Sequence, residues 1–136
     1  MSARQAQAFD AIAFQLVAAL ERYESSAAAM VAGWMDMELY RTCGREIEEI
    51  RRYSAALPQL SVAWVELLIA HAELVQTLWR NGQPGSDPKR LNDVLVHHKT
   101  CIQLLRGRAL RHLHSNNTPP ALGFKRGSPP VLPDPA

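Results

Sequence analysis

The first half of the chain places apolar side chains at alternating three- and four-residue steps, the spacing of a helix with one buried face. The first series is Ala13, Leu16, Leu20, Tyr23, Ala27, Met30 and Trp34, and the second is Leu39, Tyr40, Cys43, Ile47, Ile50 and Leu57. Between them, Gly33 can end one helix and Asp36 can cap the next. The pattern predicts helices over 4–32 and 36–56 joined by a turn. The alternative is one long helix that continues through Gly33.

A third apolar series, over residues 59–80, covers about half of a helical circumference, which is more than one neighbouring helix can bury. Its members are Leu60, Trp64, Val65, Leu67, Leu68, Ala72, Leu74, Val75, Leu78 and Trp79. Pro58 separates this helix from the preceding one, because proline disfavours helical geometry at the residue before it. Gly82 is the expected C-terminal cap. Such a helix lies at the centre of a bundle or forms an interface between subunits.

The last predicted helix spans 88–114, with Asp87 as its N-cap and Pro88 as its first residue. Gly107 is a place where it is expected to bend or end early. Six of the nine prolines fall in the final 18 residues, a composition that predicts a disordered, polyproline-like tail over 116–136. The predicted fold is therefore all-α, an up-down bundle of about four helices over residues 1–115.

Charge adds a possible partner surface to this picture. Residues 1–81 carry seven Lys or Arg and ten Asp or Glu, whereas residues 82–136 carry eight and three. The basic candidates for phosphate or nucleic-acid contact are Lys99, Arg106, Arg108 and Arg111. A positive stripe on one helix is sufficient for phosphate contacts. The competing interpretation is that this face meets the acidic half of the same chain or of a second subunit.

Histidine and cysteine side chains suggest a metal site inside the bundle. His71, His98 and Cys101 fall in or beside the apolar stripes of the last two helices, and could meet if those helices are antiparallel neighbours. Nitrogen and thiolate ligands suit zinc. The competing interpretation is a hydrogen-bonded core histidine beside an inert thiol, and it is favoured because no Glu-x-x-His pattern accompanies these residues. We therefore expect no cofactor.

Catalytic signatures are missing from the sequence. It contains no CxxC, HExxH, GxGxxG, GxxxxGK[ST] or GxSxG pattern, and the "HAE" at 71–73 lacks the Pro-Cys-x-x-Cys half of a zinc deaminase signature. We also find no secretory signal and no stretch approaching a membrane span. The chain is thus expected to be a cytoplasmic protein that is not an enzyme.

Three functions follow from these patterns. The first is a helical protein–protein interaction module, that is, an adaptor, chaperone-like or regulatory subunit. Its apolar contact residues, which also make a homodimer plausible, are Trp64, Leu68, Val75 and Trp79. The second is a nucleic-acid-binding regulatory protein that uses the basic fourth helix. The third is a small metal-binding or redox bundle.

Overall fold

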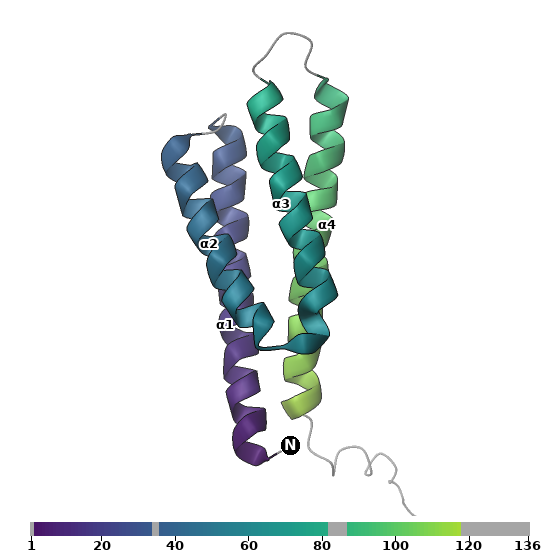
Figure 1. The fold of residues 1–136 in the computed structure, drawn as a ribbon. Coiled ribbons are helices and arrows are strands. Elements are labelled where there is room, and N and C mark those ends of the chain that lie inside the picture. Colours follow the sequence, from purple (N-terminus) through teal and green to yellow (C-terminus); the bar gives the residue numbers. More distant parts are fainter. Residues whose placement is uncertain (1, 34–35, 82–86, 118–136) are drawn as a thin grey trace, which may run out of the picture.

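The computed structural model describes residues 2–33, 36–81 and 87–117. Within these ranges the chain forms four α-helices and one 3₁₀ turn, and no strand (Figure 1). The elements are α1 (Ala3–Ala32), α2 (Met37–Ala55), the 3₁₀ turn η1 (Pro58–Leu60), α3 (Ser61–Asn81) and α4 (Pro88–Asn117). Successive helices run in opposite directions (Figure 1). The prediction of an all-α, up-down bundle is confirmed.

Local capping explains the break between α1 and α2. Helix α1 ends at Ala32, the backbone N–H of Gly33 donates to the Ala29 carbonyl at 2.9 Å, and the Asp36 carboxylate accepts from the Leu39 N–H at 3.1 Å. Gly33 has an ordinary φ of −89°, so a positive φ is not the reason for glycine here. A Cβ at this position would approach the Ala29 carbonyl oxygen to 3.3 Å. The predicted turn is confirmed, and the single long helix is wrong.

Helix α4 begins as predicted but runs further than expected. The Asp87 carboxylate accepts from the Lys89 N–H at 3.0 Å, and Pro88 is the first helical residue. The helix continues through Gly107 to Asn117, so the expected early end at Gly107 is wrong. Leu105 and Ala109 are fully buried on either side of it, and this packing outweighs the roughly 1 kcal/mol that a helical glycine costs. The tail is predicted from residue 116, but Asn116 and Asn117 belong to α4. The predicted cap at Gly82 and the rest of the predicted tail, 118–136, lie outside the described residues.

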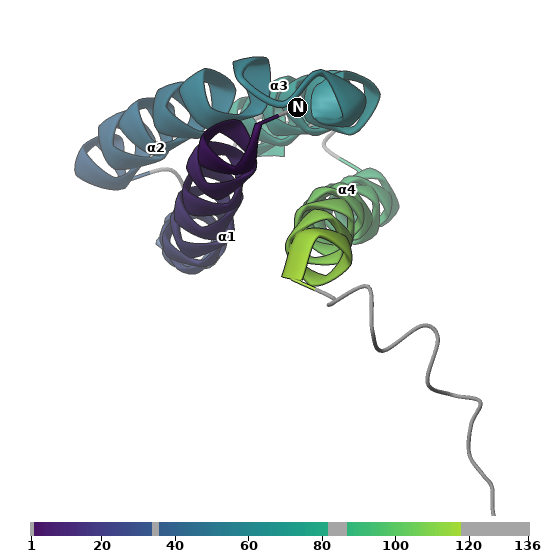
Figure 2. The same cartoon turned by 90° about the horizontal axis from the view of Figure 1, so that it is seen from below.

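The helices pack unequally. Helix α1 lies against both α2 and α4, and α3 lies along α4, whereas α2 and α3 diverge (Figures 1 and 2). The common core is built from the predicted inward positions of all four helices. Its fully buried large side chains include Leu16, Leu20, Tyr23, Ile50, Leu67, Leu74, Ile102 and Leu105. The divergence of α2 and α3 leaves one long side of α3 uncovered.

Candidate functional site

The uncovered side of α3 carries a row of uncharged, apolar residues, with the exposed Glu66 and Arg80 outside that row. We call Val65, Leu68, Ala72, Val75 and Trp79 the α3 seam. Its members follow each other at steps of three, four, three and four residues, the spacing of a coiled-coil contact line. Val65, Leu68 and Trp79 are 48%, 40% and 54% exposed. Ala72 is also exposed, and Val75 is half-buried.

The acidic residues of α3 lie on its other flank, towards α4. A carboxylate oxygen of Glu73 is 3.9 Å from the Arg90 guanidinium, and the other is 3.6 Å from Nδ1 of His97. Glu66 lies near Cys101 of α4, and its charge helps to raise the pKa of that thiol. Both acidic side chains of α3 thus interact with residues of α4, and neither is a member of the seam.

A groove separates the seam from α2. It has a volume of about 490 Å³ and is lined by Tyr40 of α2 and by several α3 residues. The α3 lining comprises Ile69, His71, Ala72, Glu73, Val75, Gln76 and Trp79. Three of the predicted apolar contact residues, Leu68, Val75 and Trp79, thus lie on or beside one accessible surface. The fourth, Trp64, is only 9% exposed and belongs to the core, so the prediction that it contacts a partner is wrong.

A buried hydrogen-bond network occupies the centre of the bundle. The hydroxyl of Tyr23 on α1, a fully buried residue, lies 2.7 Å from Nδ1 of His71 on α3 and 2.7 Å from Nε2 of His98 on α4. Both imidazole rings are tilted against the tyrosine ring, at centroid distances of 5.7 and 5.5 Å. Three of the four helices are joined by this one hydroxyl.

Burial keeps the network uncharged. It lowers the pKa of His98 to about 4, with the neighbouring His71 and His97 adding to the effect, and it lowers the pKa of His71 as well. Burial also raises the pKa of Tyr23 far above its ordinary value. Both histidines are therefore neutral at pH 7, and each carries one ring N–H. One of them donates to the Tyr23 oxygen, and the other accepts the Tyr23 proton.

The two histidines line different grooves. Within the described residues, Nε2 of His71 and Nδ1 of His98 have no hydrogen-bond partner, and neither is among the solvent-inaccessible side-chain atoms that lack one. His71 lines the groove between α2 and α3, whereas His98 lines a groove between α1 and α4. The network thus links two surfaces of the bundle through a single chain of hydrogen bonds.

The structure brings together two of the three residues predicted to bind a metal and leaves the third apart. His71 and His98 meet at Tyr23, but the Cys101 sulfur lies 3.6 Å from Nε2 of His97, which is a different ring. Over 2–33, 36–81 and 87–117, no three His, Cys, Asp or Glu side chains gather closely enough to hold a metal ion. Of the two interpretations weighed for these histidines, the geometry matches the hydrogen-bonded core.

The two thiols lack the electropositive surroundings of a nucleophile. Burial raises the pKa of Cys43 to about 11, and burial with two nearby carboxylates raises the pKa of Cys101. Both cysteines are free and buried. At neutral pH they are thiols, not thiolates, and the thiolate is the reactive form.

The basic residues of α4 do not share one face. Arg106 pairs with Glu24 of α1 at 3.6 Å, and Lys99 lies beside the same helix. At about 100° per residue, Arg108 and Arg111 fall on the opposite flank of α4. A continuous phosphate-binding stripe of these four residues is therefore not formed on this helix.

The segment Pro58–Asn81 is long and apolar enough to cross a membrane by length and composition alone. Its most apolar 18-residue window has a mean hydropathy of 1.2, and 33% of that window is buried in the bundle. This qualifies the expectation that no segment approaches a membrane span. Core helices of soluble proteins meet the same criterion, so the segment is weak evidence in either direction.

Comparison with protein-family models, with curated proteins and with solved structures finds no significant match to this chain. The features that bear on function are the α3 seam, the central network and the two grooves.

Proposed function

We propose that the protein is a non-enzymatic helical interaction module that joins two copies of itself through the α3 seam, as an adaptor or regulatory subunit. The observation that carries the proposal is an exposed, charge-free helix face with coiled-coil spacing. Five of the ten exposed large hydrophobic residues in the described ranges belong to α3. They are Val62, Val65, Leu68, Ile69 and Trp79. Apolar surface concentrated in this way is typical of interfaces.

The order of residues in the seam favours a second copy as its partner. Ala72 lies at the middle, with Leu68 and Val75 near it and Val65 and Trp79 seven residues away on either side. If two α3 helices cross antiparallel with Ala72 on the twofold axis, Val65 lies level with the partner's Trp79, and Val75 lies level with the partner's Ile69. Leu68 lies level with the partner's Gln76, one residue along from Val75. The first two pairs are apolar, and a small residue at the axis lets the helices approach closely. This is the self-complementarity that a twofold interface requires.

The contact would extend beyond the seam. Val65 to Trp79 spans about 21 Å of helix, and Tyr40 of α2 adds aromatic surface beside Trp79. A stable specific interface buries about 800 Å² on each partner. Two heptads alone fall short of a large obligate interface, so we expect reversible association with a Kd on the order of 1–100 µM.

The test is sedimentation equilibrium of the full chain over a concentration series. The wild type should change from monomer to dimer, and Leu68→Glu should weaken dimerisation by roughly 100-fold because it buries unpaired charge in the interface. The matched control is Arg45→Glu on the exposed face of α2, which should leave the Kd unchanged. A wild type that stays monomeric up to millimolar concentration would contradict the proposal. A monomer that instead co-sediments with phospholipid vesicles would assign the seam to a lipid surface and also contradict it.

A further inference from the structure

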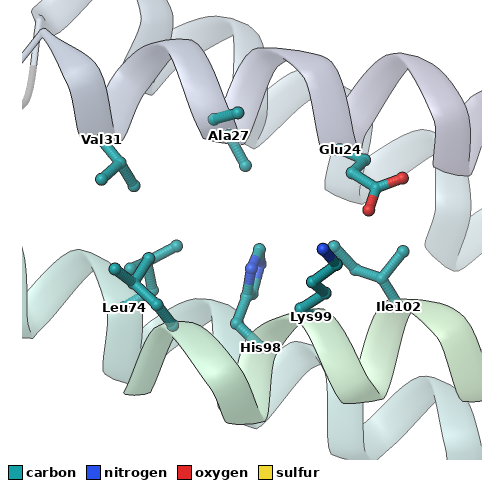
Figure 3. A pocket seen from close by; sticks show the side chains of 9 residues that line it. Glu24, Ala27, Val31, Leu74, His98, Lys99 and Ile102 are labelled. Atoms are coloured by element: carbon teal, nitrogen blue, oxygen red, sulfur yellow. The ribbon is translucent and has the colours of Figure 1, made fainter. Parts of the chain in front are cut away.

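The groove between α1 and α4 is a second concave surface, separate from the α3 seam. Its volume is about 320 Å³ (Figure 3). The apolar lining comprises Ala27, Ala28, Val31, Leu74, Leu95 and Ile102. The two alanines present small side chains where α1 faces α4, so the helices leave space between them. The volume falls at the lower end of the range for small-molecule sites.

Three polar side chains border this apolar space, namely Glu24, His98 and Lys99 (Figure 3). The Glu24 carboxylate already has a cationic neighbour, the Arg106 guanidinium at 3.6 Å. Lys99, by contrast, has no carboxylate within 4 Å among the described residues. The border of this apolar groove therefore carries two cations, Arg106 and the exposed Lys99, and one carboxylate, Glu24.

His98 provides a fixed hydrogen-bonding group at the same place. Its side chain is 5% exposed, and the bond from Nε2 to the Tyr23 hydroxyl holds the ring in position. Its Nδ1 has no partner in the described part of the chain and is not shut off from solvent. The groove is where His98 meets the surface. A buried ring with one free nitrogen is a preformed polar contact, which is how small-molecule sites fix the orientation of a ligand.

We propose that the α1–α4 groove binds a small apolar monocarboxylate. The carboxylate pairs with the Lys99 ammonium and accepts a hydrogen bond from the Nδ1–H of His98, while the apolar part lies along Ala27, Ala28 and Ile102. A neutral alcohol keeps the apolar contact but loses the ion pair. An alkylammonium ion meets Lys99, which repels it, and finds Glu24 already paired.

Binding of a carboxylate also sets the direction of the central hydrogen-bond chain. Donation from Nδ1 of neutral His98 leaves its Nε2 unprotonated, so Nε2 accepts the Tyr23 proton. The Tyr23 oxygen then accepts from Nδ1–H of His71, and Nε2 of His71 becomes an acceptor facing the groove between α2 and α3. A carboxylate in the α1–α4 groove thus makes Nε2 of His71 a hydrogen-bond acceptor at the groove between α2 and α3.

The experiment is a titration of the full-length protein with hexanoate, followed by ¹H–¹⁵N NMR at neutral pH. Hexanol and hexylamine are titrated in parallel as neutral and cationic ligands of the same length. We expect saturable shifts at residues of α1 and α4 with hexanoate, and roughly fivefold weaker binding of hexanol, which corresponds to loss of one partly exposed ion pair. Hexanol binding as tightly as hexanoate, or hexylamine binding more tightly, would overturn the proposal.

Two variants make the assignment specific. Lys99→Ala should weaken hexanoate binding by roughly fivefold without changing hexanol binding, and the exposed Lys89→Ala should change neither. Ala28→Leu, at an exposed position on the groove rim, should abolish binding of both ligands by filling the space. Long-range ¹⁵N spectra of His98 should show the proton on Nδ1 when hexanoate is bound. Hexanoate-induced shifts confined to the α3 seam, or a Lys99→Ala variant that binds like the wild type, would contradict the site.

Discussion

Helices α2 and α3 follow each other in the chain and have similar lengths, but their exposed faces differ in chemical character. The exposed side of α2 carries a row of charged residues, namely Arg41, Arg45, Glu48 and Arg52. The exposed side of α3 carries the seam, in which no residue is charged. Both faces are exposed in the single chain, so the difference between charged and apolar composition is not a difference in burial. The α2 face is suited to water, whereas the α3 face exposes apolar surface that a partner could cover.

The largest effect should come from placing charge at the centre of the seam. Ala72→Glu and Ala72→Lys each bring two like charges together if the twofold axis passes through this residue, so each should weaken dimerisation by at least about 100-fold. Mixing the two variants should restore association, because the charges across the axis are then opposite. Native mass spectrometry of the mixture distinguishes the heterodimer by mass. Homodimers of both variants, formed as readily as those of the wild type, would place the interface elsewhere.

A second test compares the histidines of the central network, His71 of α3 and His98 of α4, with the exposed charges of α2. Burial lowers the folded-state pKa values of His71 and His98 below the ordinary histidine value of 6.5, to about 4 for His98. Between about pH 6.5 and pH 4 the unfolded chain therefore binds more protons than the folded chain. The stabilisation that comes from keeping these histidines neutral is complete above about pH 6.5 and is lost as the pH falls towards 4. We expect a loss on the order of 3 kcal/mol over this interval, measured by urea unfolding.

The α2 face should not contribute from about pH 7 to pH 5. The hydrogen bond with Arg51 lowers the pKa of Glu48 from 4.5, so Glu48 is protonated only at lower pH, while Arg51 keeps its charge. A free energy of unfolding that stays constant from about pH 7 to pH 5 would contradict the buried, neutral histidines.

The Tyr23 hydroxyl at the centre of the network can be removed without removing the aromatic ring. Tyr23→Phe leaves ring nitrogens of His71 and His98 without their partner, and should lower the free energy of unfolding by about 2–3 kcal/mol. The matched control is Tyr53→Phe, whose more exposed hydroxyl donates to Gln15 at 3.3 Å, and it should cost less than about 0.5 kcal/mol. Equal losses for the two variants would show that the network does not stabilise the bundle.

The smallest effect should come from the α2 face itself. The exposed Glu48–Arg51 pair has an N–O distance of 2.9 Å, and solvent screens such pairs strongly. Arg51→Ala should therefore leave the free energy of unfolding almost unchanged, measured by thermal or urea unfolding, and should leave dimerisation intact. A change in the dimer Kd would move the interface towards α2 and remove the contrast between the two faces.

The fold was accessible from the sequence because its determinants are local. The three- and four-residue spacing of apolar positions predicts each helix, and the caps at Asp36 and Asp87 predict two of the helix starts. The length of α4 was not accessible in the same way, because tertiary packing on both sides of Gly107 overrides the preference of glycine. Local rules predict where helices begin more reliably than where packed helices end.

The sites were only partly accessible. In the sequence Tyr23 is one more apolar position, since nothing local indicates that its hydroxyl meets histidines 48 and 75 residues away. Trp64 and Trp79 belong to the same apolar series, and only the position of the other helices buries the first and exposes the second. The seam and the division of the α4 basic residues could both have been found from residue spacing, which gives angular positions on a helix.

The most direct test of self-association through α3 is disulfide formation at its proposed axis. Ala72→Cys should form a covalent dimer rapidly under mild oxidation, while Arg45→Cys on the exposed face of α2 should remain monomeric. The native Cys43 and Cys101 are buried with raised pKa values, so they should stay reduced and need no replacement. Val65→Cys and Trp79→Cys should cross-link to each other when mixed, more than either does alone. Equal cross-linking of Ala72→Cys and Arg45→Cys, or none at position 72, would contradict the account.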